Sequence, residues 1–524
     1  MDNTMSDTKP LDHWRLFGFH GGVQPPEHKW TANQVSCRMA MASELLFPLQ
    51  RRQVSLTPVV QPGDHVLAGD LLAIDPDNRQ APIVASTSGT IGAMTTAVPP
   101  LPKAAPWPAV SLHPDGQDRF RPGDVRTMAS ILQTERNALI EQIHRAGIIG
   151  LGGAGFPAAA KLRASGHVPT VLLNGAECEP FITSDDRLMQ ENAADILSGG
   201  WIIAHITQAE RIVVAIEDNK PAAITAMKTV REQLNCPLPI HIVSIPTLYP
   251  SGSEKQLIEN LTGQQLAAGQ LPASLGLVVH NVGTAKAIYD ACAHGRPLTE
   301  RLITLTGDAI AAPGNYWVRL GTPVHFVLKQ AGVQEEKLTQ IVHGGPMMGW
   351  DIVSPNTPVD ATTNCLIAAS TELFPPPPPE APCIRCGLCV EMCPAGLLPQ
   401  ELLFLIKTKQ YEQAHKWQLD QCIECGACSY VCPSHIPLVA YYRFGKDQWR
   451  EIQAKNRKAE LSRLRHERKL ARMARQEAEK KARRQRRAAN AARQTDEKKK
   501  MVAEAVARVR AKKQAQGSTD KGQD

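Results

Sequence analysis

The chain has 524 residues, of which 21% are charged and 43% hydrophobic, so it is long enough for several globular domains. No apolar run reaches the roughly 18 residues of a transmembrane helix, and the polar start MDNTMSDTKPLDHW lacks the features of a secretory signal. The formal charge of +7 hides two unlike parts. Residues 446–524 hold 26 Lys and Arg against 11 Asp and Glu, whereas the rest of the chain holds 32 against 40. We expect a cytosolic protein, and because the cytosol disfavours disulfides, its 13 cysteines need another explanation.

The first regular elements are expected between residues 54 and 95. There, VSLTPVVQPGDHVLAGDLLAID and APIVASTSGTIGAM alternate β-branched runs with turn residues, which predicts a small β-sandwich. This stretch resembles a biotinyl or lipoyl carrier domain, but no lysine occurs between Gln53 and Pro102. We therefore predict that residues 1–125 form a carrier-like β domain without an attachment lysine. The run VPPLPKAAPWP (98–108) is interpreted as a linker.

Residues 126–295 alternate helical and apolar-strand patterns. TVLLNGAE, RIVVAIED, PIHIVSIP and LGLVVHNVG are short apolar runs that end in polar or glycine turns. This rhythm predicts an α/β domain with a mostly parallel sheet, whose strand ends are available for a ligand. Residues 296–370 predict a small β domain, so the fold class is multidomain α/β. Residues 371–445 hold a polyproline spacer and a cysteine module, and 446–524 form a basic helical or disordered tail.

Two cysteine ladders, CIRCGLCVEMCP and CIECGACSYVCP, share the spacing Cys-x2-Cys-x2-Cys-x3-Cys-Pro. In two-cluster ferredoxins, three cysteines of each ladder bind one [4Fe–4S] cluster and the fourth binds the other cluster. A pair of zinc sites is the alternative, but it leaves the third cysteine of each ladder unexplained. We assign one cluster to Cys383, Cys386, Cys389 and Cys432, and the second to Cys422, Cys425, Cys428 and Cys393.

The segment GLGGAGFP contains G-x-G-x-x-G at Gly150, Gly152 and Gly155. A dinucleotide-binding fingerprint should directly follow a strand, whereas a helix-like segment precedes these glycines. The pattern alone also fits an ordinary glycine-rich turn, and without a following Gly-Lys-Ser/Thr it does not predict a triphosphate-binding loop.

Four segments together are more specific: GLGGAGFPAAAK, NGAECEP with the following DDR, YPSGSEKQLI and VHNVGTAKAI. Their order resembles that of the flavin subunit of respiratory complex I, which binds FMN and NADH in one cleft. The whole domain order, over about residues 10–445, resembles the C subunit of the Rnf (Rsx) ion-translocating electron-transport complexes. That resemblance implies an FMN- and NADH-binding domain at 126–295, a soluble-ligand-binding (SLBB-like) β domain at 296–370 and a two-cluster ferredoxin domain at 371–445.

The resemblance also implies roles for individual residues. Gly152, Gly153 and Gly155 would let the backbone approach the phosphates of FMN and NADH, Phe156 would stack near a ring of NADH, and Lys161 would offset phosphate charge. Asn174 and Glu177 would bind the isoalloxazine or ribityl group, and Glu179 the ribose hydroxyls of NADH. Gly252, Ser253, Glu254 and Asn281 would complete the flavin pocket. No separate catalytic side chain is implied.

Two positions depart from the complex I pattern, because Ala176 stands where an acid is usual and Gly283 where a glutamate is usual. Two alternatives stay open: a soluble flavin and iron–sulfur reductase, such as a cobalamin reductase, and a cluster-carrying adaptor without an active flavin site. Cys178 has no nearby histidine in the sequence and is interpreted as a small buried side chain.

The resemblance implies partners as well. The chain would dock peripherally on integral membrane subunits, on the cytoplasmic side of a bacterial inner membrane, and exchange electrons with ferredoxin or another small carrier. The tail has glutamates among its cations at helical spacing, so we expect a solvated helix that can contact an anionic membrane surface. It lacks the aromatic residues of nucleic-acid sites beyond Trp449, and we predict no nucleic-acid partner.

Overall fold

The computed structural model describes residues 14–51, 54–101 and 105–516. Two β-sheets form the N-terminal domain. The larger has the strand order β2-β10-β9-β6 and the smaller β5-β7-β8, and they enclose a core that includes Leu45, Leu72 and Val110. The strands are β2 (Leu45–Pro48), β5 (Thr57–Pro58), β6 (His65–Val66), β7 (Leu71–Ile74), β8 (Ile83–Val84), β9 (Gly89–Ala97) and β10 (Trp107–Pro114), with a hairpin of β3 (Gln50–Arg51) and β4 (Val54–Ser55) beside them.

One prediction for this domain is wrong. Residues 98–108 do not link two domains, because β9 and β10 are antiparallel neighbours in one sheet, with Trp107 opposite Ala97. The proline-rich run is therefore a connection within the β domain, and its residues 102–104 lie outside the described part of the chain.

A four-stranded parallel sheet lies at the centre of the next domain, in the order β13-β12-β11-β14. Along β11, Leu173 and Leu172 belong to different hydrophobic clusters, because successive side chains point to opposite faces of a sheet. Helices therefore cover both faces, and the sheet is parallel, as the rhythm of the sequence predicted. The strands are β11 (Thr170–Gly175), β12 (Arg211–Glu217), β13 (Ile240–Ile245) and β14 (Leu277–Asn281).

The helices of this domain pack around the sheet. Residues of α5 and α8 contribute to the core on one face, and residues of α7 contribute to the core on the other. Asn281 caps the start of α8 by accepting a hydrogen bond from the Gly283 amide. The helices are α1 (Met128–Leu132), α2 (Arg136–Arg145), α3 (Ala158–Ser165), α4 (Ser184–Glu191), α5 (Ala193–Thr207), α6 (Pro221–Gln233), α7 (Glu254–Thr262) and α8 (Val282–His294), with a 3-10 turn at Pro272–Leu275.

The third domain is a mixed sheet in the order β1-β16-β15-β19-β17-β18. Its edge strand β1 (Cys37–Arg38) comes from the N-terminal part of the chain and runs parallel to β16. Helix α9 (Val324–Gln330) packs on this sheet through Val324, Val327 and Leu328. The other strands are β15 (Glu300–Thr306), β16 (Gly314–Arg319), β17 (Gln340–His343), β18 (Trp350–Asp351) and β19 (Cys365–Ala369).

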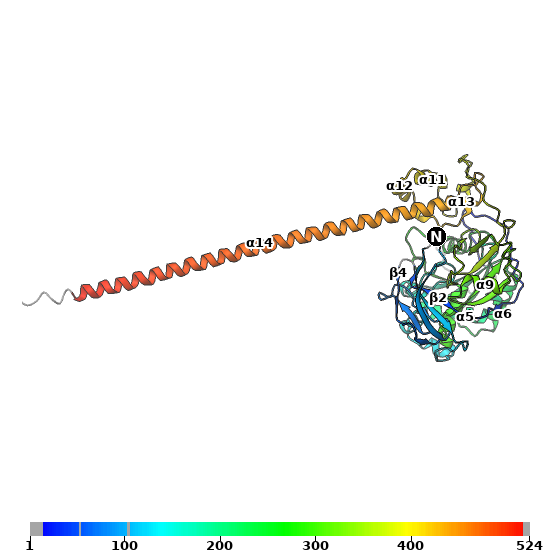
Figure 1. Cartoon of the computed structure of the whole chain (residues 1–524), viewed down its shortest axis with the longest axis horizontal. Coiled ribbons are helices and arrows are strands. Elements are labelled where there is room, and N and C mark those ends of the chain that lie inside the picture. Colours follow the sequence, from blue (N-terminus) through cyan, green and yellow to red (C-terminus); the bar gives the residue numbers. More distant parts are fainter. Residues whose placement is uncertain (1–13, 52–53, 102–104, 517–524) are drawn as a thin grey trace, which may run out of the picture. The chain divides into compact units, whose positions relative to one another are not determined.

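Short helices build the cysteine module around a core that includes Leu402, Leu419 and Tyr442. They are α10 (Leu388–Glu391), α11 (Pro399–Lys407), α12 (Tyr411–Lys416) and α13 (Ala427–Tyr430), with a 3-10 turn at Leu419–Gln421. Helix α14 (Leu438–Gln516) begins in this module and includes residues 446–516 of the tail (Figure 1).

The chain divides into two units, Met1–Gly445 and Lys446–Asp524. In the second unit, side chains 454–515 are exposed, and ion pairs such as Lys455 with Glu451 lie one helical turn apart. The tail is therefore a solvated helix over its described residues. Among the described helices, none is both long and apolar enough to cross a lipid bilayer. The predicted multidomain α/β class is confirmed.

The crossing of α5 and α8 gives a prediction about stability. A Cβ atom on Gly199 would lie 1.9 Å from the carbonyl oxygen of Ala285, whereas one on Gly200 would meet side chains only, that of Leu173 at 2.9 Å and that of Ile212 at 3.5 Å. We expect Gly199→Ala to destabilise the protein by about 3 kcal/mol or more, and Gly200→Ala by clearly less, because a side chain adjusts where backbone does not. Thermal unfolding of the two variants measures the difference, and equal melting temperatures would contradict it.

Candidate functional site

The glycine loop connects helix α2 to helix α3, so it does not follow a strand as a Rossmann fingerprint does. It is closed by hydrogen bonds from the Gly150 amide to the Phe156 carbonyl (2.8 Å) and from the Gly155 amide to the Gly150 carbonyl (3.2 Å). Gly153 has a φ of +91° and no other chain segment within 4 Å of its Cβ position, and Phe156 is 45% exposed. The loop therefore presents open backbone, which suits the approach of a phosphate.

Contacts bring the loop and the other predicted pocket residues to one edge of the parallel sheet. A Cβ on Gly152 would lie 3.4 Å from the Asn281 side chain, and Asn281 pairs in register with Asn174 on the neighbouring strand. Asn174 donates to the carbonyl of Gly252 (2.8 Å), in the turn that leads into α7. These residues lie at the carboxyl ends of their strands, where open α/β sheets bind ligands.

Lys161 and Glu254 join the two helices at this edge. Lys161 belongs to α3 and forms an ion pair with Glu254, the first residue of α7, while Ser253 is the N-cap residue of α7. Both charged side chains are partly exposed. The start of α7 thus meets the residue predicted to offset phosphate charge.

Glu177 is buried and caps helix α4. Its carboxylate accepts hydrogen bonds from the Asp185 amide (2.7 Å), the Asp186 amide (3.3 Å) and the Ser184 hydroxyl (3.2 Å). Burial raises the pKa of Glu177 to about 7, even though Lys29 and Lys220 oppose the shift. The side chain predicted to bind flavin therefore has protein partners of its own at the start of a helix.

Glu179 connects the α/β domain to the third domain. Its carboxylate accepts hydrogen bonds from the amides of Met347 (3.1 Å) and Met348 (2.8 Å). A Cβ on Gly345 would come within 2.2 Å of this carboxylate, so the turn needs glycine there. Burial raises the pKa of Glu179 to about 7. The predicted role of Glu179, binding the ribose of NADH, stays a prediction.

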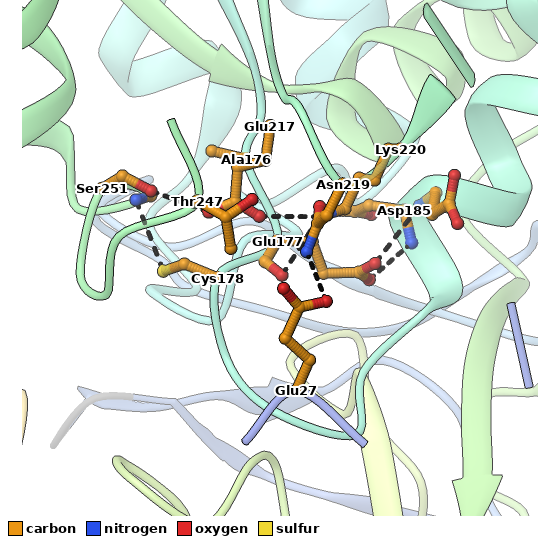
Figure 2. A network of polar contacts seen from close by, with 12 residues as sticks. Glu27, Ala176, Glu177, Cys178, Asp185, Glu217, Asn219, Lys220, Thr247 and Ser251 are labelled. Carbon is orange, nitrogen blue, oxygen red and sulfur yellow. Dashed lines mark hydrogen bonds and ion pairs between the residues drawn. The ribbon is translucent and has the colours of Figure 1, made fainter. Parts of the chain in front are cut away.

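A buried pair of charges that we did not predict, Glu217 and Lys220, lies beside Glu177 (Figure 2). Glu217, at the end of β12, accepts a hydrogen bond from Lys220 (2.6 Å) and one from the Ser251 hydroxyl (2.7 Å). Lys220 is only 3% exposed; burial lowers its pKa, but the neighbouring carboxylates outweigh burial and raise it overall. In the sequence, the signal was the EDNK turn at the end of a buried strand in a parallel sheet.

A second lysine, which is partly buried, comes from the N-terminal part of the chain. Lys29 donates hydrogen bonds to the carbonyls of Glu177 (2.7 Å), Glu179 (2.9 Å) and Ile182 (2.7 Å). No periodicity or motif in the irregular stretch around Lys29 points to this contact.

Ala176 and Gly283, the two departures from the complex I pattern, both lie just beyond the carboxyl ends of strands of the parallel sheet. The Ala176 amide donates to the Asn174 side chain, and Gly283 occupies the first turn of α8, where it lines a cavity of about 550 Å³. Cys178 is half-buried, and its thiol accepts a hydrogen bond from the Gly252 amide; desolvation of the thiol raises its pKa far above the usual range. Such a thiol is not a nucleophile at neutral pH.

The cysteines of the two ladders form two groups, and each group lines its own cavity. We call Cys393, Cys422, Cys425 and Cys428 the inner cysteine set, and Cys383, Cys386, Cys389 and Cys432 the outer cysteine set. Each set combines three cysteines of one ladder with the last cysteine of the other, which is the grouping that the crossed assignment requires. The assignment of clusters to these residues stays a prediction.

The spread of the thiols suits a cluster better than one ion. Among residues 14–51, 54–101 and 105–516, no three His, Cys, Asp or Glu side chains gather closely enough to hold a single metal ion. Four thiols around a cavity match the four corners of a cubane, whereas a tetrahedral zinc needs its ligands within bonding distance of one point. Gly387 and Gly426 have φ values of +87° and +82°, so the tight turn of each ladder uses its glycine.

The inner set faces the α/β domain. The Tyr249 hydroxyl donates to the Cys425 carbonyl (2.5 Å), and the Gln256 side chain donates to the Pro394 carbonyl (3.0 Å). Cys425 shares a small hydrophobic cluster with Val23, Tyr249 and Cys178. Cys383 and Cys386 of the outer set are exposed. These contacts join the α/β domain to the inner set, whereas two cysteines of the outer set face solvent.

Four family models match the chain. A Nuo51 FMN-binding domain covers residues 143–290, and a 4Fe-4S dicluster domain covers 382–436. An RnfC barrel sandwich hybrid domain covers 17–117, and an SLBB domain covers 302–351. Fold and site thus define an iron–sulfur flavoprotein that transfers electrons, whose cofactors are FMN and [4Fe–4S] clusters.

Curated relatives narrow the class to one family. The C subunit of the ion-translocating oxidoreductase complex of Edwardsiella ictaluri is 44% identical over 88% of this chain and 58% of that protein. The C subunits of the same complex from Yersinia pestis and Serratia proteamaculans are 42% and 43% identical, over 88% and 95% of this chain and 74% and 70% of theirs. The chain belongs to this family of proteins, as the resemblance indicated.

Among solved structures, a chain of an NAD⁺-reducing [NiFe]-hydrogenase aligns with 62% of this chain and 66% of its own length. The TM-score is 0.46 and the identity 17%, which is too low to support an argument.

The burial of Glu179 predicts a dependence of stability on pH. Because its folded-state pKa of about 7 exceeds the ordinary value of 4.5, the native state holds this proton to higher pH than the unfolded state. The free energy of unfolding therefore loses this contribution as pH rises from 4.5 through 7. In Glu179→Gln, melting temperatures between pH 5 and 8 should fall less with rising pH than in the wild type. The control is Glu210→Gln, which changes an exposed glutamate. If the melting temperature of both variants falls with pH as steeply as that of the wild type, the prediction is contradicted.

Proposed function

We propose that this chain is the peripheral subunit through which electrons pass between NADH and the membrane-bound part of an ion-translocating complex. The α/β domain would hold FMN and admit NADH, and the cysteine module would hold two [4Fe–4S] clusters. The observation that carries the proposal is the docking of the inner cysteine set against the carboxyl edge of the FMN-binding domain, through Tyr249 and Cys425. The names of the relatives support the coupling to ion movement.

When bound, FMN accepts a hydride from a nicotinamide, and the clusters carry single electrons. The protein residues would supply position and charge. The open backbone at Gly153 and the start of α7 would receive phosphate groups, with Lys161 offsetting their charge. Asn174 and Asn281, side by side at the ends of paired strands, would orient the flavin ring system.

The outer cysteine set would be the contact point for other proteins. Ile384, in the loop of this set, is 68% exposed, and Leu388, at the start of α10, is 39% exposed. Exposed apolar side chains next to a redox site suit a transient contact with a small electron carrier. Ferredoxin is the carrier that we propose, with integral subunits of the complex as stable partners on the cytoplasmic side of a bacterial inner membrane.

The test of the proposal uses the full chain, reconstituted anaerobically, with its iron, zinc and flavin counted. We expect one FMN and about eight iron atoms per chain, as two cubane clusters require, and bleaching of the flavin and cluster absorbance on addition of NADH. Clusters without NADH-dependent bleaching would instead support an adaptor with an inactive flavin site. Activity that stays fully soluble when membranes are added back would favour a soluble reductase.

Cysteine variants test the two sets separately. We expect Cys386→Ser to remove the electron paramagnetic resonance signal of one cluster and Cys425→Ser that of the other, because each replaces a ligand from a different set. In Cys386→Ser, NADH should still reduce the remaining cluster. Cys37→Ser, an exposed cysteine outside both ladders, is the control. Loss of the same signal in both ladder variants would refute the division.

The tail would bind an anionic membrane surface. Residues 480–487 hold six cations on an exposed helix, and each cation near an anionic surface contributes up to about 1 kcal/mol. We expect the full chain to sediment with phosphatidylglycerol vesicles but not with phosphatidylcholine vesicles, and salt to release it. Replacing the six cations with Gln should weaken binding at least tenfold. Undiminished binding of this variant would show that the tail is not the membrane contact.

A further inference from the structure

A short N-terminal segment crosses the loop that carries both predicted site glutamates. We call residues 27–32 the strap and residues 176–183 the acidic loop. The Phe181 amide donates to the Glu27 carbonyl (2.9 Å), and the His28 ring stacks on the Phe181 ring at 4.7 Å. The Thr31 and Thr183 hydroxyls form a hydrogen bond. The strap therefore holds the acidic loop at several points, although the two segments are about 150 residues apart.

Lys29 is the charged part of this contact. Each of its three hydrogen bonds ends on a backbone carbonyl of the acidic loop, at Glu177, Glu179 and Ile182. An ammonium group has three N–H donors, so these carbonyls account for all of them. The three carbonyls lie on residues 177, 179 and 182, which requires the loop to curve around one atom. The geometry of the loop thus depends on the Lys29 Nζ atom.

The surroundings of Lys29 contain few compensating charges. Burial and the nearby Lys220 lower its pKa, while Glu177 and Glu217 oppose the shift. Glu217 is already bound by Lys220 and Ser251. A partly buried lysine held there without a direct carboxylate partner costs the fold stability, because a charge removed from water is expensive unless it is paired. A purely structural strap could have been built with a neutral hydrogen-bond donor.

We propose that Lys29 is a positioning residue for the flavin site. It shapes the acidic loop for FMN and the nicotinamide, and its positive charge favours the reduced, more negative form of the flavin. This inference rests on the proposed function, because it places the flavin beside the acidic loop. It assigns a role to a residue outside the matched FMN-binding domain, which begins at residue 143.

The experiment compares Lys29→Met with Lys329→Met, an exposed lysine on α9, in the full chain loaded with its cofactors. Two readouts are independent of NADH turnover: the dissociation constant of FMN from the flavin-free protein, and the flavin midpoint potential in a dithionite titration. In Lys29→Met we expect about tenfold weaker FMN binding, the effect of losing hydrogen bonds to a charged group, and a more negative potential. The control should match the wild type in both.

Two further variants separate charge from shape. Lys29→Gln keeps two N–H donors but no charge, so the potential should fall while FMN affinity is largely retained. Lys29→Arg keeps the charge and should restore the potential. If Lys29→Met does not fold, Lys29→Gln decides the question. Wild-type potential and FMN affinity in a folded neutral variant would overturn the proposal.

Failure of the proposal about Lys29 can be distinguished from failure of the proposed function. If NADH does not reduce the wild-type flavin but dithionite does, the proposed electron donor is wrong, and the two readouts still test Lys29. If NADH reduces the wild type, and Lys29→Met and Lys329→Met behave alike in both readouts, only the inference about Lys29 is wrong.

Discussion

Glu217 and Lys220 are buried charges at the carboxyl edge of the parallel sheet, and each needs the other as a partner. The acidic loop and the turns around it are arranged about this ion pair. Glu217 ends the central strand β12 with no exposure to solvent, and Lys220 binds it from the following turn. Removing one member of such a pair typically costs about 3–5 kcal/mol, because the other is left buried and uncompensated. The acidic loop lies directly against this pair and brings Glu177 to the start of α4.

The same edge is where the separate domains meet. Met347 and Met348, from the third domain, donate their amides to Glu179 of the acidic loop. A Cβ on Gly426 would lie 2.6 Å from the Met347 carbonyl, so the cysteine module contacts the same turn. Tyr249 then adds its hydrogen bond to Cys425. The turn around Met347 thus lies between the acidic loop and the inner cysteine set, and a change in one has a short physical path to the other.

Local sequence patterns were sufficient to predict the strands of the parallel sheet and the grouping of the cysteines. The apolar runs around Leu172, Val213 and Val279 form adjacent parallel strands. They could be predicted because the hydrophobic pattern of a strand and the turn residues that end it are local features of the sequence. The cysteine spacing indicated which thiols should be grouped, and the two cavities have that grouping. The roles of individual flavin-site residues came from a family resemblance, and they remain predictions.

Contacts between distant segments could not be predicted. Lys29 meets the acidic loop, and Cys37 meets Tyr316 as an added edge strand, only after the chain has folded. The run 98–108 looked like a linker because proline composition does not reveal whether the flanking strands pair with each other. For the same reason, nothing in the sequence near Glu179 indicates that its partners are two amides about 170 residues away.

The central claim is that the inner cysteine set lies between the flavin site and the outer set in the path of electrons. Freeze-quench paramagnetic resonance after addition of one equivalent of NADH to the holoprotein tests it most directly. The account predicts that the signal abolished by Cys425→Ser appears before the signal abolished by Cys386→Ser. Appearance of the Cys386-dependent signal first, or reduction of the flavin with neither signal, would contradict the account.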